Sequence, residues 1–125
     1  MKAIAVLLLI VASSFAQAPD LNGRWAGEWS SDANGHHGPL KARFRKVDDC
    51  TYQVTYRGRF FVVVPFVYRT SMTVTGDGPG FVSLSASKKL PFVGEFRSEA
   101  TATGTDFTST FQSGKDSGQF LLRRR

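Results

Sequence analysis

The chain has 125 residues, about the length of one domain. Its composition is 42% hydrophobic, 13% aromatic and 21% charged, which excludes a disordered tail and supplies enough apolar side chains for a core. Lys and Arg number 16 against 10 Asp and Glu, so the formal charge is +6, and a single cysteine excludes an intramolecular disulfide and a four-cysteine zinc site.

The first residues have the form of a secretory signal peptide. A lysine follows the initiator methionine, residues 3–12 are uninterrupted apolar residues, and small residues come next. A bilayer span needs roughly 20 residues, so this run is too short for one. We predict a signal peptide over residues 1–16, cleaved after Ala16. Cleavage after Ala18 and a retained membrane anchor are the alternatives. Residues 17–125 would then form a secreted or periplasmic domain without a membrane span.

Beyond Pro19 the chain alternates apolar and polar residues in short runs separated by Gly, Asp, Asn and Ser, a pattern typical of β-strands. Two Pro residues, Pro65 and Pro91, interrupt apolar runs and predict sharp bends, because proline cannot donate a hydrogen bond to a sheet. The expected strands lie at about residues 23–30, 39–47, 52–57, 66–75, 81–87, 94–103, 107–113 and 119–123.

Eight strands in simple succession with short connections most easily form an antiparallel meander, and closure hides its edges best. We therefore predict an all-β domain, a single eight-stranded antiparallel up-and-down barrel. Apolar positions point inward and polar ones outward, as in a soluble barrel. A membrane barrel would show the reverse pattern.

The start of the first strand carries a family resemblance. Leu21-Asn22-Gly23-Arg24-Trp25 resembles the start of lipocalins and avidins, which share a Gly-x-Trp at this place and a basic residue on the final strand. The resemblance implies structural roles for Gly23 and Trp25, a cation–π contact on the Trp25 ring, and ligand binding. Arg123, Arg124 or Arg125 could supply the cation, and inward parity favours Arg124. The chain lacks the C-terminal helix typical of lipocalins and the biotin-binding residues of avidin, and it also resembles small exported bacterial proteins without an assigned activity.

The predicted interior mixes aromatic with small side chains. In an eight-stranded barrel such side chains either fill the lumen or leave one small cavity, and both outcomes stay open. Apolar cavities with few polar groups are the usual small-molecule sites. We predict a non-enzymatic binding module that holds a small apolar or aromatic ligand; a solid barrel with a purely structural role is the alternative. The ligand-binding residues would be Trp29, Phe44, Tyr56, Tyr68, Met72, Ser98 and Phe111.

A band of outward cations suggests a competing function. If Val47 pairs with Thr51, the two strands carrying the band place like charges opposite each other, which is unfavourable without a partner. An envelope surface-interaction protein that binds anionic polymers is therefore the alternative function, and a solvated face is the alternative to any function. Nucleic acid is not expected, because the aromatic residues lie on the opposite face. The cations are Lys41, Arg43, Arg45, Arg57 and Arg59.

The sequence offers little for catalysis or metal binding. His36 and His37 are adjacent in a Gly-bounded loop and match no metal-ligand spacing. Cys50 follows two aspartates, which disfavour a reactive thiolate. No Gly-x-Ser-x-Gly motif occurs, and all the glutamates have outward parity. We therefore predict no enzymatic activity, no metal and no cofactor.

Overall fold

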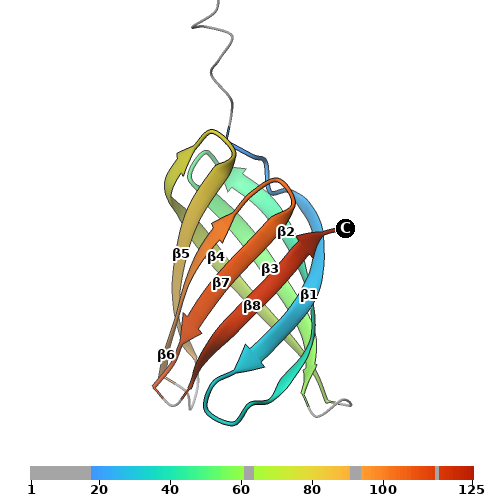
Figure 1. The fold of residues 1–125 in the computed structure, drawn as a ribbon. Coiled ribbons are helices and arrows are strands. Elements are labelled where there is room, and N and C mark those ends of the chain that lie inside the picture. The colour runs from blue at the N-terminus through green and yellow to red at the C-terminus, as the bar shows by residue number, and fades with distance from the viewer. Residues whose placement is uncertain (1–17, 61–63, 91–93, 115) are drawn as a thin grey trace, which may run out of the picture.

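The computed structural model describes residues 18–60, 64–90, 94–114 and 116–125, so the predicted signal peptide and its cleavage site lie outside the described residues. Eight antiparallel strands form one closed up-and-down barrel in chain order, which confirms the predicted fold (Figure 1). The strands are β1 (Gly23–Ser31), β2 (His37–Asp48), β3 (Thr51–Phe60), β4 (Val64–Gly78), β5 (Phe81–Leu90), β6 (Gly94–Ala102), β7 (Asp106–Gln112) and β8 (Ser117–Arg124).

The period-two alternation produces the barrel because successive side chains in a strand point to opposite faces. β2 shows this directly: Leu40, Ala42 and Phe44 are buried and the residues between them are exposed. β7 repeats the pattern with Phe107, Ser109 and Phe111. Burying these faces removes apolar surface from water, the main driving force for the fold.

One end of the barrel, the upper end in Figure 1, is closed by residues 18–22. Leu21 is fully buried there, and its carbonyl accepts a hydrogen bond from Trp25 Nε1 at 2.9 Å. The Leu21 amide donates to the Tyr52 hydroxyl at 3.2 Å. The Arg124 guanidinium lies 4.6 Å from the centre of the Trp25 ring, which confirms the predicted cation–π contact. We call this the closed end.

One detail of the strand pairing differs from the sequence prediction. Asp48, not Val47, pairs with Thr51, because a bulge shifts the register between Lys46 and Asp48. The shift stays local, so Lys41 still opposes Arg57 as expected. The predicted reversal lies just before Pro65: β3 ends at Phe60, β4 begins at Val64, and Pro65 itself pairs with Arg59 within the ladder. The predicted bend at Pro91 falls outside the described residues.

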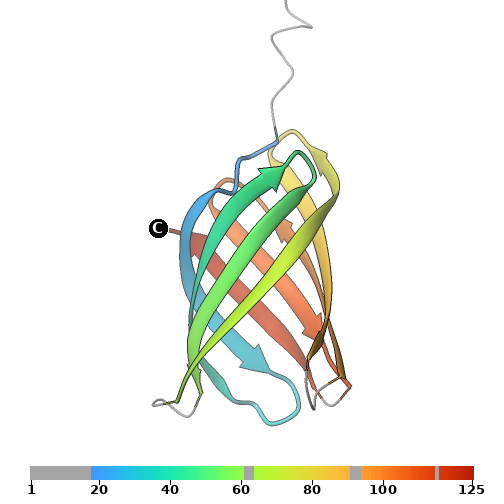
Figure 2. The ribbon, with the colours of Figure 1, turned by 180° about the vertical axis from the view of Figure 1, so that it is seen from behind.

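The wall is not paired along its full length between β4 and β5. Their described ladder runs from Gly78 and Phe81 to Thr73 and Ser85, and the rest of each strand pairs only with its other neighbour. Figure 2, from behind, shows β4 and β5 diverging toward the lower end. Pro65 therefore lies on a strand edge, where its missing N–H costs no ladder hydrogen bond. We call the unpaired stretch the β4–β5 seam.

Candidate functional site

The predicted ligand-binding residues lie inside the barrel but at two levels. Phe44 packs at the closed end, where its ring centroid is 5.6 Å from that of Trp25 and 5.1 Å from that of Phe107. Trp29 lies toward the other end, with its ring 6.4 Å from Phe66 and its Nε1 donating to the Arg59 carbonyl at 3.2 Å. The structure therefore does not gather all seven residues around one point.

Between these levels, five aromatic rings form a closed circuit around the interior. The centroid distances are 6.0 Å for Tyr56–Tyr68, 5.2 Å for Tyr68–Phe96, 5.4 Å for Phe96–Phe111, 5.2 Å for Phe111–Phe120 and 4.9 Å for Phe120–Tyr56. These separations are those of rings in contact. Ser98, also predicted to line the site, is buried beside this circuit as the cross-strand partner of Phe111.

The interior tyrosine hydroxyls have unequal environments. Tyr56 is buried, and its hydroxyl donates to Met72 Sδ at 3.7 Å. Burial and the neighbouring Tyr68 raise the Tyr56 pKa far above its ordinary value. The Tyr68 hydroxyl oxygen is also buried and has no hydrogen-bond partner of good geometry among the described residues. Burial raises the Tyr68 pKa, and the Thr70 side chain on the same strand offsets part of the rise.

The outer wall opposite β5–β7 concentrates positive charge. Arg24 of β1 pairs with Arg43 of β2, which lies opposite Thr55 of β3, and Thr55 in turn lies opposite Arg69 of β4. The Arg125 amide donates to the Arg24 carbonyl at 2.9 Å, which extends this row by one more cation.

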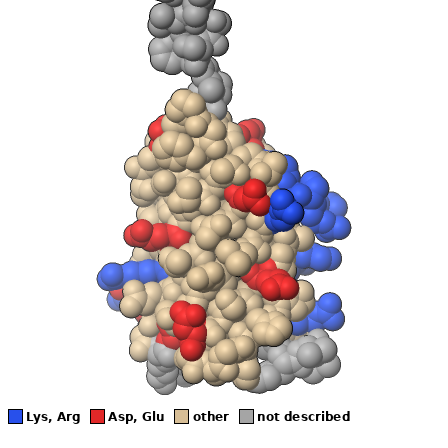
Figure 3. Space-filling model, viewed as in Figure 1, with Lys and Arg blue, Asp and Glu red and all other residues tan. Residues whose placement is uncertain are grey.

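One pleat further from the closed end, Lys41 lies opposite Arg57. Arg59 comes next along β3. In Figure 3 most of the Lys and Arg side chains in view lie along the right-hand edge of the molecule, and a smaller group lies on the left. We define the basic face as Arg24, Lys41, Arg43, Arg57, Arg59, Arg69 and Arg125.

The basic face contains a depression of about 300 Å³. Six of the residues that line it are cations and none is acidic. The ion pairs formed by the described residues, Arg97–Glu95 and Arg123–Asp106, lie outside the face. Like charges opposed across a ladder repel. Among the described residues, no ion pair joins a cation of the basic face to a carboxylate.

The structure adds three cations to the predicted set and removes one from it. Arg45 points outward as predicted, but its guanidinium donates to the Gln53 side chain, so we leave it out of the face. Sequence reasoning missed Arg24, Arg69 and Arg125. Outward parity identifies Arg24, but its neighbours depend on the β1–β2 register and on closure between β1 and β8.

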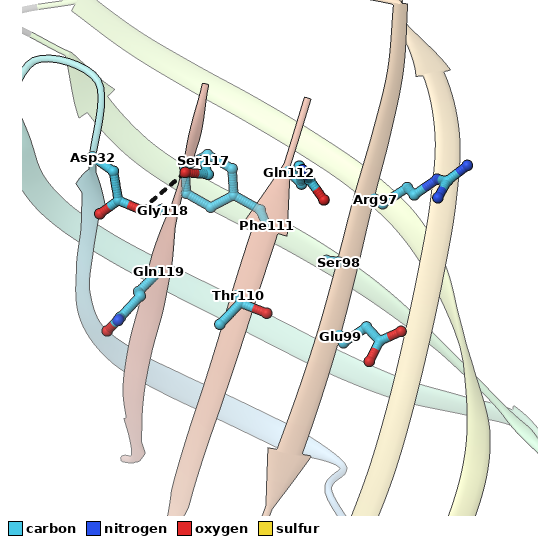
Figure 4. Close-up of a pocket in the computed structure, with 10 residues that line it drawn as sticks. All are labelled: Asp32, Arg97, Ser98, Glu99, Thr110, Phe111, Gln112, Ser117, Gly118 and Gln119. Carbon is cyan, nitrogen blue, oxygen red and sulfur yellow. Dashed lines mark hydrogen bonds between the residues drawn. The ribbon is translucent and has the colours of Figure 1, made fainter. Parts of the chain in front are cut away.

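A second depression, of about 390 Å³, lies on the opposite wall across β6, β7 and β8 (Figure 4). Glu99, Thr110 and Gln119 are cross-strand neighbours there, and Asp32 accepts a hydrogen bond from the Ser117 hydroxyl at 2.9 Å. Arg97, the cation that lines it, is paired with Glu95. No set of like charges converges in it, so it offers less to a ligand than the basic face does.

The remaining sequence candidates are exposed. His36 lies in the β1–β2 loop, His37 begins β2, and Cys50 lies in the β2–β3 turn with a free thiol. The described residues contain no group of three or more His, Cys, Asp or Glu that could hold a metal ion. Within the same residues, no helix is long and apolar enough to cross a membrane.

Comparison with known proteins gives no family for this chain: no family model matches it, and no curated protein does.

Proposed function

We propose that this protein is a non-enzymatic binding module that holds an anionic polymer or an anionic envelope surface on its basic face. The cross-strand pairing of Arg24 with Arg43 and of Lys41 with Arg57, without an acidic partner among the described residues, carries the proposal. Repulsion of this kind is relieved when an anion binds. Arginine suits the role because its planar guanidinium holds phosphate, sulfate or carboxylate groups in bidentate fashion.

The proposal fits export of the mature chain to the envelope or beyond, where anionic polymers are exposed. The Gly23-x-Trp25 motif and the stacked Arg124 support the proposed kinship with lipocalins and avidins, since both features have the form found in those families. The proposed kinship concerns the barrel scaffold and not the basic face. The basic face lies on the outside of the wall and is independent of any ligand in the lumen.

Binding to dextran sulfate at increasing salt tests the proposal. Each polymer charge neutralised by the face releases a counterion, so affinity is expected to fall steeply, roughly a thousandfold between about 50 and 200 mM salt. The double variant Arg43→Glu/Arg57→Glu should lose binding. Lys89→Glu/Arg97→Glu, with the same change in net charge on β5 and β6, should retain most of it. If both variants lose the same affinity for dextran sulfate, binding depends on net charge alone, and the proposal of a specific binding face is wrong.

A small apolar or aromatic ligand inside the barrel remains a second candidate function, favoured by one observation. The buried Tyr68 hydroxyl has no hydrogen-bond partner of good geometry among the described residues, and it lies beside the β4–β5 seam. A buried polar group left unpaired is costly, and a ligand acceptor would satisfy it. Across the seam, Lys88 Nζ donates to the Arg69 carbonyl at 2.6 Å and lies 5.4 Å from the centre of the Tyr68 ring.

Native mass spectrometry of protein purified from its host, followed by displacement of the neutral dye N-phenyl-1-naphthylamine, tests this second function. A bound small molecule that the dye displaces, and that is retained less by Tyr68→Phe, would support it. Protein that carries no molecule and takes up no dye would leave the barrel a purely structural scaffold for the basic face.

A further inference from the structure

From the structure we infer that the anionic partner of the basic face is the surface of an anionic phospholipid bilayer, a conclusion that rests on the proposed function. The inference comes from apolar side chains that adjoin the cations on the same wall. Val64 and Val67 of β4 are 48% and 55% exposed, and Pro39 and Pro65 are exposed as well. They lie toward the end of the barrel away from the closed end.

Register places these apolar side chains directly among the cations. Val67 pairs with Arg57, and Pro65 pairs with Arg59, across the β3–β4 ladder. Pro39 and Lys41 join the same residues around a shallow depression of about 400 Å³. We define the apolar margin as Pro39, Pro65 and Val67 on the outer wall, together with Val64, which has inward parity but is exposed where β4 begins.

The wall therefore has two compositions along its length. Near the closed end, the row of Arg24, Arg43 and Arg69 is charged and its remaining member, Thr55, is polar. Away from the closed end, cations and apolar side chains alternate across the ladder. A hydrated polymer makes ionic contacts with both regions but gains little from Val67 or Pro65, because it has no apolar surface to cover them.

An anionic bilayer matches both compositions. Its phosphate groups pair with the cations, and juxtamembrane Lys and Arg are attracted by the negative surface potential of such leaflets. The apolar margin would enter the boundary between headgroups and acyl chains, as the apolar side of interfacial proteins does. The barrel would then rest with its β3–β4 wall on the membrane and the margin deepest.

The residues on the unpaired edges of the β4–β5 seam are consistent with this orientation. β4 has no described β5 partner over Val64–Met72, so Val64, Pro65 and Val67 lie on a strand edge, whereas Pro39 lies within the sheet and pairs with Glu28 of β1. Free edges attract other strands, and proline and lysine are residues that discourage such pairing. Pro65 and Lys88 occupy the two sides of the seam, which favours contact with a lipid surface over addition of a strand.

Vesicle flotation tests the inference, with phosphatidylcholine vesicles compared to phosphatidylcholine–phosphatidylglycerol vesicles. The protein should float only with the anionic vesicles. Val64→Ser/Val67→Ser should weaken that binding about tenfold through loss of buried apolar area, while its affinity for dextran sulfate stays unchanged. Leu121→Ser, at a side chain 48% exposed on β8, removes a comparable exposed side chain elsewhere and should bind like the parent protein.

The outcomes separate the two proposals. Unchanged flotation of Val64→Ser/Val67→Ser, or dextran sulfate binding without any vesicle binding, would overturn the lipid inference and leave the basic face standing. Failure to bind both dextran sulfate and anionic vesicles would overturn the two together. Equal thermal unfolding midpoints for the valine variant and the parent exclude misfolding as the cause of a loss.

Discussion

Arg124 and Trp25 are cross-strand partners at the junction where β8 meets β1, and the guanidinium of one lies 4.6 Å from the ring centre of the other. The same guanidinium donates to the Gly104 carbonyl at 2.8 Å and to the Asn22 carbonyl at 2.7 Å, and it also donates to the Asp20 carbonyl. One side chain thus connects the first strand, the last strand, the β6–β7 turn and the segment that covers the closed end.

Replacing Arg124 by Met should lower the free energy of unfolding by about 2 kcal/mol, from loss of the cation–π contact and of hydrogen bonds to three carbonyls. Arg124→Lys should lose about half as much, because lysine keeps the charge but not the planar fork. Urea unfolding measures both. The loss of unfolding free energy caused by Arg124→Met should be smaller in a Trp25→Leu background, where the ring is absent. Equal losses in the two backgrounds would show that Arg124 and Trp25 have no coupling energy.

Trp25→Ala should cost about 3–5 kcal/mol, the range for truncating a large core aromatic side chain. Trp25 has no exposed surface, and its indole N–H bonds to the Leu21 carbonyl, so the change leaves both a cavity and an unpaired acceptor. Denaturant unfolding gives the value directly. A loss under about 1 kcal/mol would contradict the burial of this side chain.

Gly27 should not tolerate a methyl group. An ideal Cβ at this position would lie 1.8 Å from the Leu121 carbonyl oxygen, so Gly27→Ala forces β1 and β8 apart. We expect a loss of about 1–3 kcal/mol, as for other overpacked sites. Gly76→Ala is the matched control, because no atom lies within 4 Å of a Cβ there. Thermal unfolding of the two variants should differ clearly, and equal midpoints would mean that the strands do not approach closely at Gly27.

Arg43→Glu should weaken polyanion binding without weakening the fold. The carboxylate would face Arg24 across the β1–β2 ladder and replace repulsion by attraction, a change of about 0.5 kcal/mol in favour of the folded state. Urea unfolding at low salt should therefore show equal or higher stability. A clear decrease would mean that the cations at this site already have a compensating partner.

Asp116 should make stability fall in acid. The Ser31 hydroxyl donates to its carboxylate at 2.6 Å and holds the Asp116 pKa below its ordinary value, with help from the amides of Ala33 and Ser117 and against the effect of burial. A depressed carboxyl pKa in the folded state stabilises the protein above the unfolded pKa, near pH 4, and this contribution is lost as pH falls through the folded pKa.

Unfolding free energies measured from pH 6 down to pH 3 check this dependence. Asp116→Asn should start lower and fall less steeply over the acid part of the range. Part of the slope should remain in that variant, because the pKa of Asp106 is also lowered, by the Thr105 hydroxyl first and by Arg123. Parallel curves for the variant and the parent would contradict a folded-state role for the Asp116 carboxylate.

Which side chains face inward can be predicted from the sequence alone, because the side-chain period of a strand is two and each strand carries that period locally. Phe44, Tyr56 and Leu122 could be assigned to the core in this way, and Lys41 and Arg57 to the outside. Counting eight such strands with short connections was enough to predict a closed barrel. The resemblance to lipocalins and avidins implies a basic residue of the last strand over Trp25, and parity favours Arg124 for that place.

Beyond the β2–β3 pair, where Lys41 opposes Arg57 as expected, the cross-strand neighbours are known only from the folded barrel. The bulge between Lys46 and Asp48, the entry of Arg69 into the basic face and the seam between β4 and β5 all depend on register. The alternation excludes a register shift of one residue, which would turn every side chain to the other face, but shifts of two residues are left to turn geometry and long-range pairing. The same alternation therefore predicted a basic band but could not show that the band adjoins an apolar margin, which is where the proposed membrane contact arises.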